Sequence, residues 1–103
     1  MKIKTIDVNV KEWFDKVNGN SYFAGTVIVN YQMKSEKRFL LPFQYGYDDH
    51  YRDMAFKLLC DKGIIKGCDR NTIHWHYYRD NKIIARHSKE HNCLKRELTR
   101  LTV

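Results

Sequence analysis

The sequence has little of what stabilises secreted or membrane-spanning proteins. Its three cysteines, Cys60, Cys68 and Cys93, are an odd and sparse set for a disulfide framework. No run of apolar residues approaches the roughly 20 needed to cross a bilayer, and the first residues alternate in polarity where a signal peptide would have an apolar core. We therefore expect a soluble cytoplasmic protein with free thiols.

Proline and glycine are also scarce, with one proline and five glycines in 103 residues. The chain contains no linker, internal repeat or low-complexity tract, and its length is typical of a single domain, here residues 1–103. Hydrophobic residues make up 43% of the chain and fourteen residues are aromatic, a composition that excludes a disordered protein.

Negative charge is in deficit, because 12 Asp and Glu residues face 19 Lys and Arg residues and leave a net charge of +7. Residues 62–103 contain ten of the basic and four of the acidic residues, together with four of the five histidines. A basic segment attracts polyanions, and nucleic acid is the commonest polyanion inside cells. The charge distribution therefore favours a partner that carries or handles nucleic acid.

The first half of the chain alternates between apolar and polar residues, as β-strands do. Asn18-Gly19-Asn20 predicts a turn, because these residues tolerate positive φ. Pro42 cannot donate to a sheet ladder, so its strand belongs at an edge or an irregular join, with Phe39, Leu41, Phe43 and Tyr45 on its inward side. We expect strands over residues 3–10, 21–32 and 38–46, a helical turn over 11–17 and an exposed loop over 34–37.

A helix is predicted from about Asp49 to Lys62. Gly46 removes a Cβ at the strand-to-helix join, and a carboxylate of Asp48 or Asp49 can cap the helix start. At the other end Gly63 can adopt the left-handed conformation that ends helices, with Ile64 as its hydrophobic contact. The apolar face follows helical spacing and consists of Tyr51, Met54, Ala55, Leu58 and Leu59.

Residues 72–78 alternate again and predict a strand that turns at Asp80-Asn81 and returns over 83–87. Ser88 can then cap a last helix whose apolar seam is Leu94, Leu98 and Leu101. This order of elements predicts an α+β fold, with an antiparallel sheet, a packed central helix, and a C-terminal β-hairpin and helix.

Two segments carry a family resemblance. Residues 14–22 read Phe-Asp-Lys-Val-Asn-Gly-Asn-Ser-Tyr, and residues 42–48 read Pro-Phe-Gln-Tyr-Gly-Tyr-Asp. Together with the helix that contains Tyr51, Ala55 and Leu58-Leu59-Cys60, they resemble a group of small, mostly uncharacterised bacteriophage proteins. The resemblance covers about residues 6–65 and transfers no site residue. It implies a protein that binds and disables host machinery, such as an anti-CRISPR inhibitor of host defence.

The predicted hairpin places His74 across from His87, with His76 on the same face. Three imidazoles are a candidate metal site, but their spacing is not that of a known zinc motif and the hairpin offers no carboxylate as an obvious hydrogen-bond partner for them. We expect them to lie on the surface without a metal. A metal-dependent nuclease of the ββα-metal class, which would also use His91 and Asn92, is an alternative. Tyr45, Tyr47 and Tyr51 could stack on bases, although packing is the expectation.

The exposed cations of the predicted hairpin and last helix form our predicted partner-binding surface. We expect a non-enzymatic protein without a cofactor that binds a host nucleoprotein or other nucleic-acid-handling complex and inhibits host defence. Direct binding of nucleic acid is the first alternative, and nuclease activity is the second. The surface consists of Arg79, Lys82, Arg86, Lys89, Arg96 and Arg100.

Overall fold

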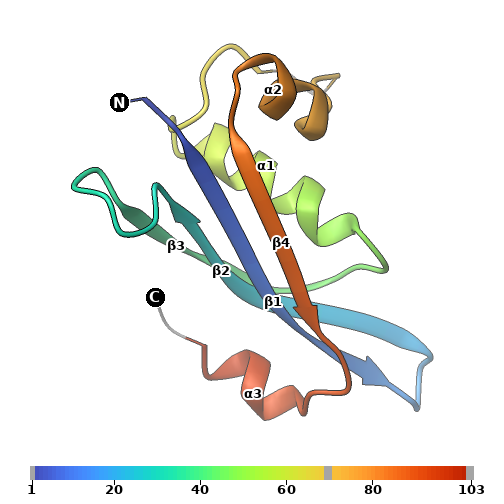
Figure 1. Cartoon of the computed structure of the whole chain (residues 1–103). Helices are drawn as coiled ribbons and strands as arrows, with labels where there is room; N and C mark the ends of the chain where they lie inside the picture. The colour runs from blue at the N-terminus through green and yellow to red at the C-terminus, as the bar shows by residue number, and fades with distance from the viewer. Residues whose placement is uncertain (1, 69–70, 102–103) are drawn as a thin grey trace.

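A computed structural model describes residues 2–68 and 71–101 of the chain. It contains one four-stranded sheet in the order β3-β2-β1-β4, with helices on both faces (Figure 1). The α+β fold predicted from the sequence is therefore confirmed. No helix in the described ranges is long and apolar enough to cross a membrane. The elements are β1 (Thr5–Asp15), β2 (Asn20–Val29), β3 (Lys37–Tyr45), α1 (His50–Asp61), α2 (His74–Asp80), β4 (Ile84–Glu90) and α3 (Lys95–Thr99).

The sheet is mixed, whereas the sequence predicted an antiparallel one. β1 pairs antiparallel with β2, and β2 pairs antiparallel with β3. β4 lies on the other side of β1 and runs parallel to it, with Thr5 opposite Ile84 and Lys11 opposite Glu90. A parallel pair needs a long connection, which here contains β2, β3, α1 and α2. The predicted C-terminal hairpin is therefore wrong.

β1 continues as a strand through the segment predicted as a helical turn. Trp13 lies opposite Tyr22 of β2, and their rings stack with centroids 5.4 Å apart. This cross-strand aromatic pair stabilises an extended conformation that local sequence does not specify. The turn that follows is at the predicted place, with Gly19 at φ 68° and its N–H donating to the Asp15 carbonyl at 2.7 Å.

The sheet separates two hydrophobic cores. Side chains of β1 and β2 such as Ile6, Val8 and Val27 are fully buried beneath α1 and α2. On the opposite face Ala24 and Leu98 form a smaller core under α3. The aromatic side chains packed against this smaller core are those of Trp13, Tyr22 and Phe43.

β3 contributes to both cores because its register with β2 shifts beside Pro42, the irregular join that proline predicted. Phe39 and Leu41 pack in the core under α1, whereas Phe43 packs in the core under α3. The predicted single inward face of this strand is therefore wrong beyond Pro42. The extra residue of the bulge exchanges the two faces of the strand.

α1 ends as predicted, in a turn centred on Gly63. Gly63 has φ 73°, its N–H donates to the Cys60 carbonyl at 3.0 Å, and the Ile64 N–H donates to the Leu59 carbonyl at 3.0 Å. These two bonds define a Schellman motif. At the helix start the predicted carboxylate cap is wrong, because Asp49 occupies the cap position without a side-chain capping bond.

The buried face of α1 consists of Tyr51, Ala55, Phe56 and Leu59. Phe56 was not predicted, and the predicted Met54 and Leu58 pack only partly against the same core. Phe56 faces α2 and contacts the rings of His74, Tyr77 and Tyr78 at centroid distances of 6.4, 5.6 and 5.6 Å. These three positions have helical spacing, which explains why residues 74–80 form α2 where a strand was predicted.

α3 is shorter than predicted and starts later. Ser88 belongs to β4, and the helix starts after Leu94, whose N–H donates to the Glu97 carboxylate at 2.6 Å. Leu98 is buried and Leu101 packs partly against it, but Leu94 is 52% exposed and does not belong to the seam.

The cysteines also differ from expectation. Cys60 of α1 and Cys68 form a disulfide with their Cα atoms 6.6 Å apart, so the segment after α1 is tied back to the helix. Cys93 is the free cysteine of the described residues and is buried.

Candidate functional site

The six cations of the predicted binding surface do not form one surface, because the hairpin that would have aligned them is absent. Arg79 lies in α2 and Lys82 follows it, whereas Arg96 and Arg100 lie in and just after α3 on the opposite face of the sheet. Arg79 bonds the neighbouring Asp80 at 3.1 Å and lies over the Trp75 ring at 5.7 Å.

Arg86 is neutralised by a partner in β1. Its Nε and Nη2 atoms donate to the two carboxylate oxygens of Asp7 at 2.6 and 2.9 Å. This bidentate geometry is the strongest that an Arg–carboxylate pair adopts, and it raises the pKa of Arg86. Arg86 therefore contributes little net attraction for an anion.

Lys89 has a structural role, with only 10% of its side chain exposed. Its Nζ donates to the Glu12 carboxylate at 3.2 Å and to the Asp48 carbonyl, and it lies 5.1 Å from the centroid of the Tyr51 ring. Burial acts to raise the pKa of Glu12, but hydrogen bonds from His91 and Lys89 outweigh it and lower that pKa. Lys89 is thus occupied within the protein.

Positive charge instead collects at one end of the sheet. β1 and β4 begin there, the β2–β3 loop lies there, and α1 and α2 both end there, in the upper part of Figure 1. We define the basic end as residues 2–4, 34–38, 61–66 and 79–82. These four segments contain nine Lys and Arg residues but three Asp and Glu residues, and so account for six of the seven net positive charges of the chain.

A hollow of about 520 Å³ opens within the basic end. It receives Lys2 from the N-terminal segment, Lys37 from the start of β3 and Lys66 from the segment after α1. None of these three lysines forms an ion pair with any residue in the described ranges. We call it the lysine hollow, and its remaining walls are Ile3, Gly63, Ile64, Tyr77, Asn81 and Ile83.

Asn30 holds this end together, although the sequence analysis did not single it out. Its side chain is fully buried and uses all of its hydrogen-bonding capacity. Oδ1 accepts from the N–H groups of Lys4 and Thr5 at 2.7 and 3.3 Å, and Nδ2 donates to the Lys2 carbonyl and the Ser35 hydroxyl, both at 2.9 Å. The one signal in the sequence was an Asn directly after an apolar strand. Asn tolerates positive φ, and in the structure Asn30 has φ 53°.

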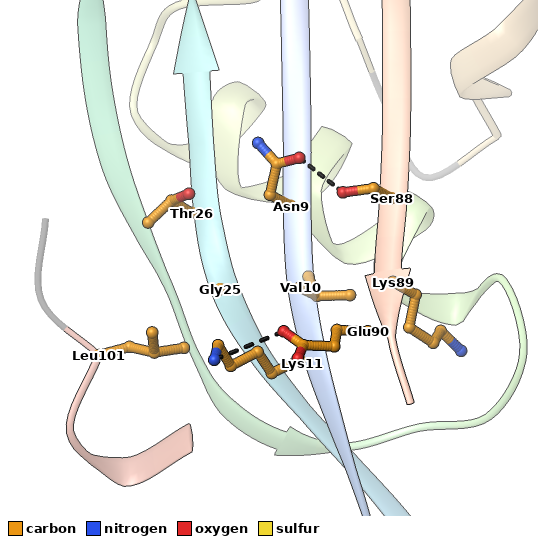
Figure 2. A pocket seen from close by; sticks show the side chains of 9 residues that line it. All are labelled: Asn9, Val10, Lys11, Gly25, Thr26, Ser88, Lys89, Glu90 and Leu101. Carbon is orange, nitrogen blue, oxygen red and sulfur yellow. Dashed lines mark hydrogen bonds and ion pairs between the residues drawn. The ribbon is translucent and has the colours of Figure 1, made fainter. Parts of the chain in front are cut away.

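A second hollow, of about 370 Å³, lies on the sheet face beside α3 (Figure 2). Its polar groups are paired with each other: the Ser88 hydroxyl donates to Asn9 Oδ1 at 2.6 Å, and Lys11 pairs with Glu90 at 3.5 Å. Because its charges are balanced, this hollow offers an anion much less than the lysine hollow does.

The predicted histidine group is assembled only in part. His74 of α2 and His87 of β4 lie with ring centroids 6.2 Å apart, but through a helix packed on a strand and not through a hairpin. His74 Nδ1, His87 Nε2 and the Tyr78 hydroxyl are buried without a hydrogen-bond partner in the described structure, so the surface position predicted for the two histidines is wrong. Residues 2–68 and 71–101 contain no group of three His, Cys, Asp or Glu side chains arranged to hold a metal ion.

Acid should destabilise the protein through this histidine pair. Burial, followed by the charges of Arg52 and His74, lowers the pKa of His87 from 6.5 to about 4, against smaller opposing effects of Asp49 and Asp7. His87 therefore takes up a proton below about pH 6.5 in the unfolded chain, but only below about pH 4 in the folded protein. We expect the free energy of unfolding to fall by about 1–2 kcal/mol over that range, after allowance for solvent screening.

Urea unfolding at a series of pH values measures this effect. His87→Gln should flatten the acid limb of the profile, and His76→Gln, at a neighbouring position in α2 outside the pair, should leave it in place. An unchanged acid limb in His87→Gln would show that another group is responsible.

The three tyrosines considered for base stacking differ in their exposure to solvent. Tyr51 belongs to the buried face of α1, whereas Tyr45 and Tyr47 are 53% and 42% exposed and their ring centroids lie 5.3 Å apart. The Tyr47 hydroxyl donates to the Gly19 carbonyl at 2.8 Å, beside the acidic residues Asp48 and Asp49. Two carboxylates next to Tyr47 would repel a phosphate, so packing is favoured over contact with nucleic acid.

Comparison of the chain with protein-family models, curated protein sequences and solved structures finds no match.

Proposed function

We propose that this protein acts without catalysis, by binding a nucleic-acid-handling complex of a bacterial host through the basic end. The observation that carries the proposal is the concentration of six of the seven net positive charges in four segments that meet at one end of the sheet. Like charges held together repel each other, and a polyanionic partner relieves that repulsion and releases counterions when it binds.

Cations outside the basic end are paired with carboxylates, which supports the basic end as the binding surface. Arg86 and Lys89 are held by Asp7 and Glu12, and Lys11 is shared between Glu90 and Glu97 at 3.5 and 3.7 Å. A long-range field therefore comes mainly from the basic end, where it can orient the protein toward an approaching polyanion and accelerate association.

The resemblance of residues 14–22 and 42–48 to bacteriophage proteins supports a particular biological setting. We propose that the protein works in the host cytoplasm as an inhibitor of host defence, such as CRISPR, and that the complex it binds is the defence nucleoprotein. Binding alone suffices for such a role, because occupying the nucleic-acid path of a complex blocks it without any reaction.

The test is capture of the complex from a bacterial lysate that contains an active CRISPR system, together with survival of a plasmid that this system targets. We expect the wild-type protein to capture the nucleoprotein and to protect the plasmid. Lys4→Glu with Lys34→Glu should lower both strongly, because the change reverses two exposed charges of the basic end.

A matched control separates position from net charge. Lys16→Glu with Lys57→Glu makes the same change in net charge on exposed residues outside the basic end, and it should keep both activities. Arg96→Glu with Arg100→Glu tests the surface predicted from the sequence in the same way. If that variant loses both activities while the basic-end variant keeps them, the proposed interface lies on the wrong part of the molecule.

A further inference from the structure

The lysine hollow differs from an ordinary basic surface in being concave and unbalanced in charge. Its three lysines come from separate parts of the chain, at positions 2, 37 and 66, and converge on one opening. The residues of the described chain that line it include no Asp or Glu. An anion inside it would meet cations on several sides and no like charge.

The lining of the hollow other than its lysines is largely apolar, and we call this part the floor. Ile3 and Ile64 are partly buried there, Ile83 is 9% exposed, and Tyr77 presents an aromatic side chain. Such a floor can cover a sugar and a flat base, which a site for phosphate alone would not need.

The carboxyl end of α1, whose dipole would repel an anion, is satisfied within the protein. The carbonyls of Leu58, Leu59 and Cys60 accept from the N–H groups of Lys62, Ile64 and Gly63 at 2.9, 3.0 and 3.0 Å. These three carbonyls thus already have N–H partners, which weakens the negative end that α1 would present to an anion.

We propose that the lysine hollow binds one nucleotide of a single-stranded nucleic acid, with its phosphate among Lys2, Lys37 and Lys66 and its base or sugar over the apolar floor. The inference rests on the proposed function and names the part of the partner that is contacted. A volume of about 520 Å³ accommodates a nucleotide unit. A duplex presents its phosphates on a convex surface with its bases paired inside, so it cannot place a base there, whereas a single strand can.

The first test measures binding of a short fluorescein-labelled oligothymidylate by anisotropy at several salt concentrations. Replacing Lys2, Lys37 and Lys66 together by alanine should weaken binding on the order of 100-fold at about 0.1 M salt. It should also flatten the salt slope by about 0.7, because one neutralised phosphate of a single strand contributes about 0.7 to that slope. Replacing Lys16, Lys57 and Lys95 by alanine removes the same charge from other exposed positions and should change binding by less than about threefold.

The second test separates the concave site from charge alone. Asn81→Trp places an indole at the wall of the hollow and keeps every lysine, so it should weaken oligothymidylate binding about tenfold or more if a nucleotide enters. Circular dichroism establishes that the variant is folded, since the Asn81 amide donates to the Tyr77 carbonyl at 2.9 Å in the wild type. The lysine triple variant tests the site independently of that bond.

Three results would overturn the inference: wild-type protein that does not bind the oligothymidylate, Asn81→Trp that binds it as the wild type does, or the same strand annealed to oligoadenylate binding as tightly as the free strand. The inference can fail while the proposed function stands. If capture of the nucleoprotein depends on Lys4 and Lys34 while free oligonucleotide is not bound, the basic end contacts the complex by another route and the lysine hollow is not a nucleotide site.

Discussion

Gly25→Ala is expected to destabilise the protein severely. A Cβ added to Gly25 would lie 2.0 Å from the carbonyl oxygen of Asn9 and 2.6 Å from the Cα of Val10. Both are backbone atoms of β1, the strand beside β2 that Figure 2 shows at this point. β1 is paired with β2 on one side and with β4 on the other, so it cannot retreat without breaking one of the two ladders.

We expect Gly25→Ala to cost more than about 4 kcal/mol, above the usual range for overpacking, because backbone and not a flexible side chain occupies the space. Far-ultraviolet circular dichroism and urea unfolding measure the loss. Gly19→Ala is the matched control: no atom lies within 4 Å of its added Cβ, and its φ of 68° should cost about 1 kcal/mol. Equal urea midpoints for the two variants would contradict the close approach of β1 and β2.

The elements that the sequence predicted correctly are those with local causes. The turn at Gly19 and the end of α1 at Gly63 follow from the tolerance of glycine for positive φ, and both form where they were predicted. The irregular join at Pro42 follows from a missing N–H. Each of these signals is contained within a few residues, so no knowledge of distant partners was needed.

The elements that were predicted wrongly depend on distant partners. Ile73, Trp75 and Tyr77 alternate like a strand, yet the same stretch also places His74, Tyr77 and Tyr78 at helical spacing, and Phe56 of α1 makes the second pattern the stable one. Residues 11–15 extend because Trp13 stacks on Tyr22. Short aromatic segments fit either structure, and tertiary packing decides between them.

The candidate site was hard to predict for a related reason. The sequence groups charges by position in the chain, whereas β4 pairs with a strand almost eighty residues earlier. That pairing brings Asp7 to Arg86 and Glu12 to Lys89, and it removes two cations from the predicted surface. It also brings the start of β4 beside the N-terminal segment, so that lysines from both halves of the chain meet. Counting charges along the chain cannot show which cations remain without a carboxylate partner in the folded protein.

Loss of the Asn30 side chain should damage both the stability and the binding of the basic end. In Asn30→Ala the N–H groups of Lys4 and Thr5 and the carbonyl of Lys2 lose their partner at a fully buried position. Buried polar groups left without a partner cost about 1–3 kcal/mol each, and since Lys4 is near solvent we expect about 3 kcal/mol in total. Urea unfolding measures this loss.

Asn30→Gly separates the side-chain bonds from the backbone conformation, because glycine accepts the φ of 53° that strains alanine. It should recover about 1 kcal/mol of the loss and no more. Below the unfolding transition, both variants should also bind oligothymidylate more weakly than the wild type, because the Asn30 bond to the Lys2 carbonyl positions the backbone from which one wall of the lysine hollow extends. Full recovery of stability in Asn30→Gly, with oligothymidylate affinity unchanged, would show that backbone strain and not the hydrogen-bond network sets the role of Asn30.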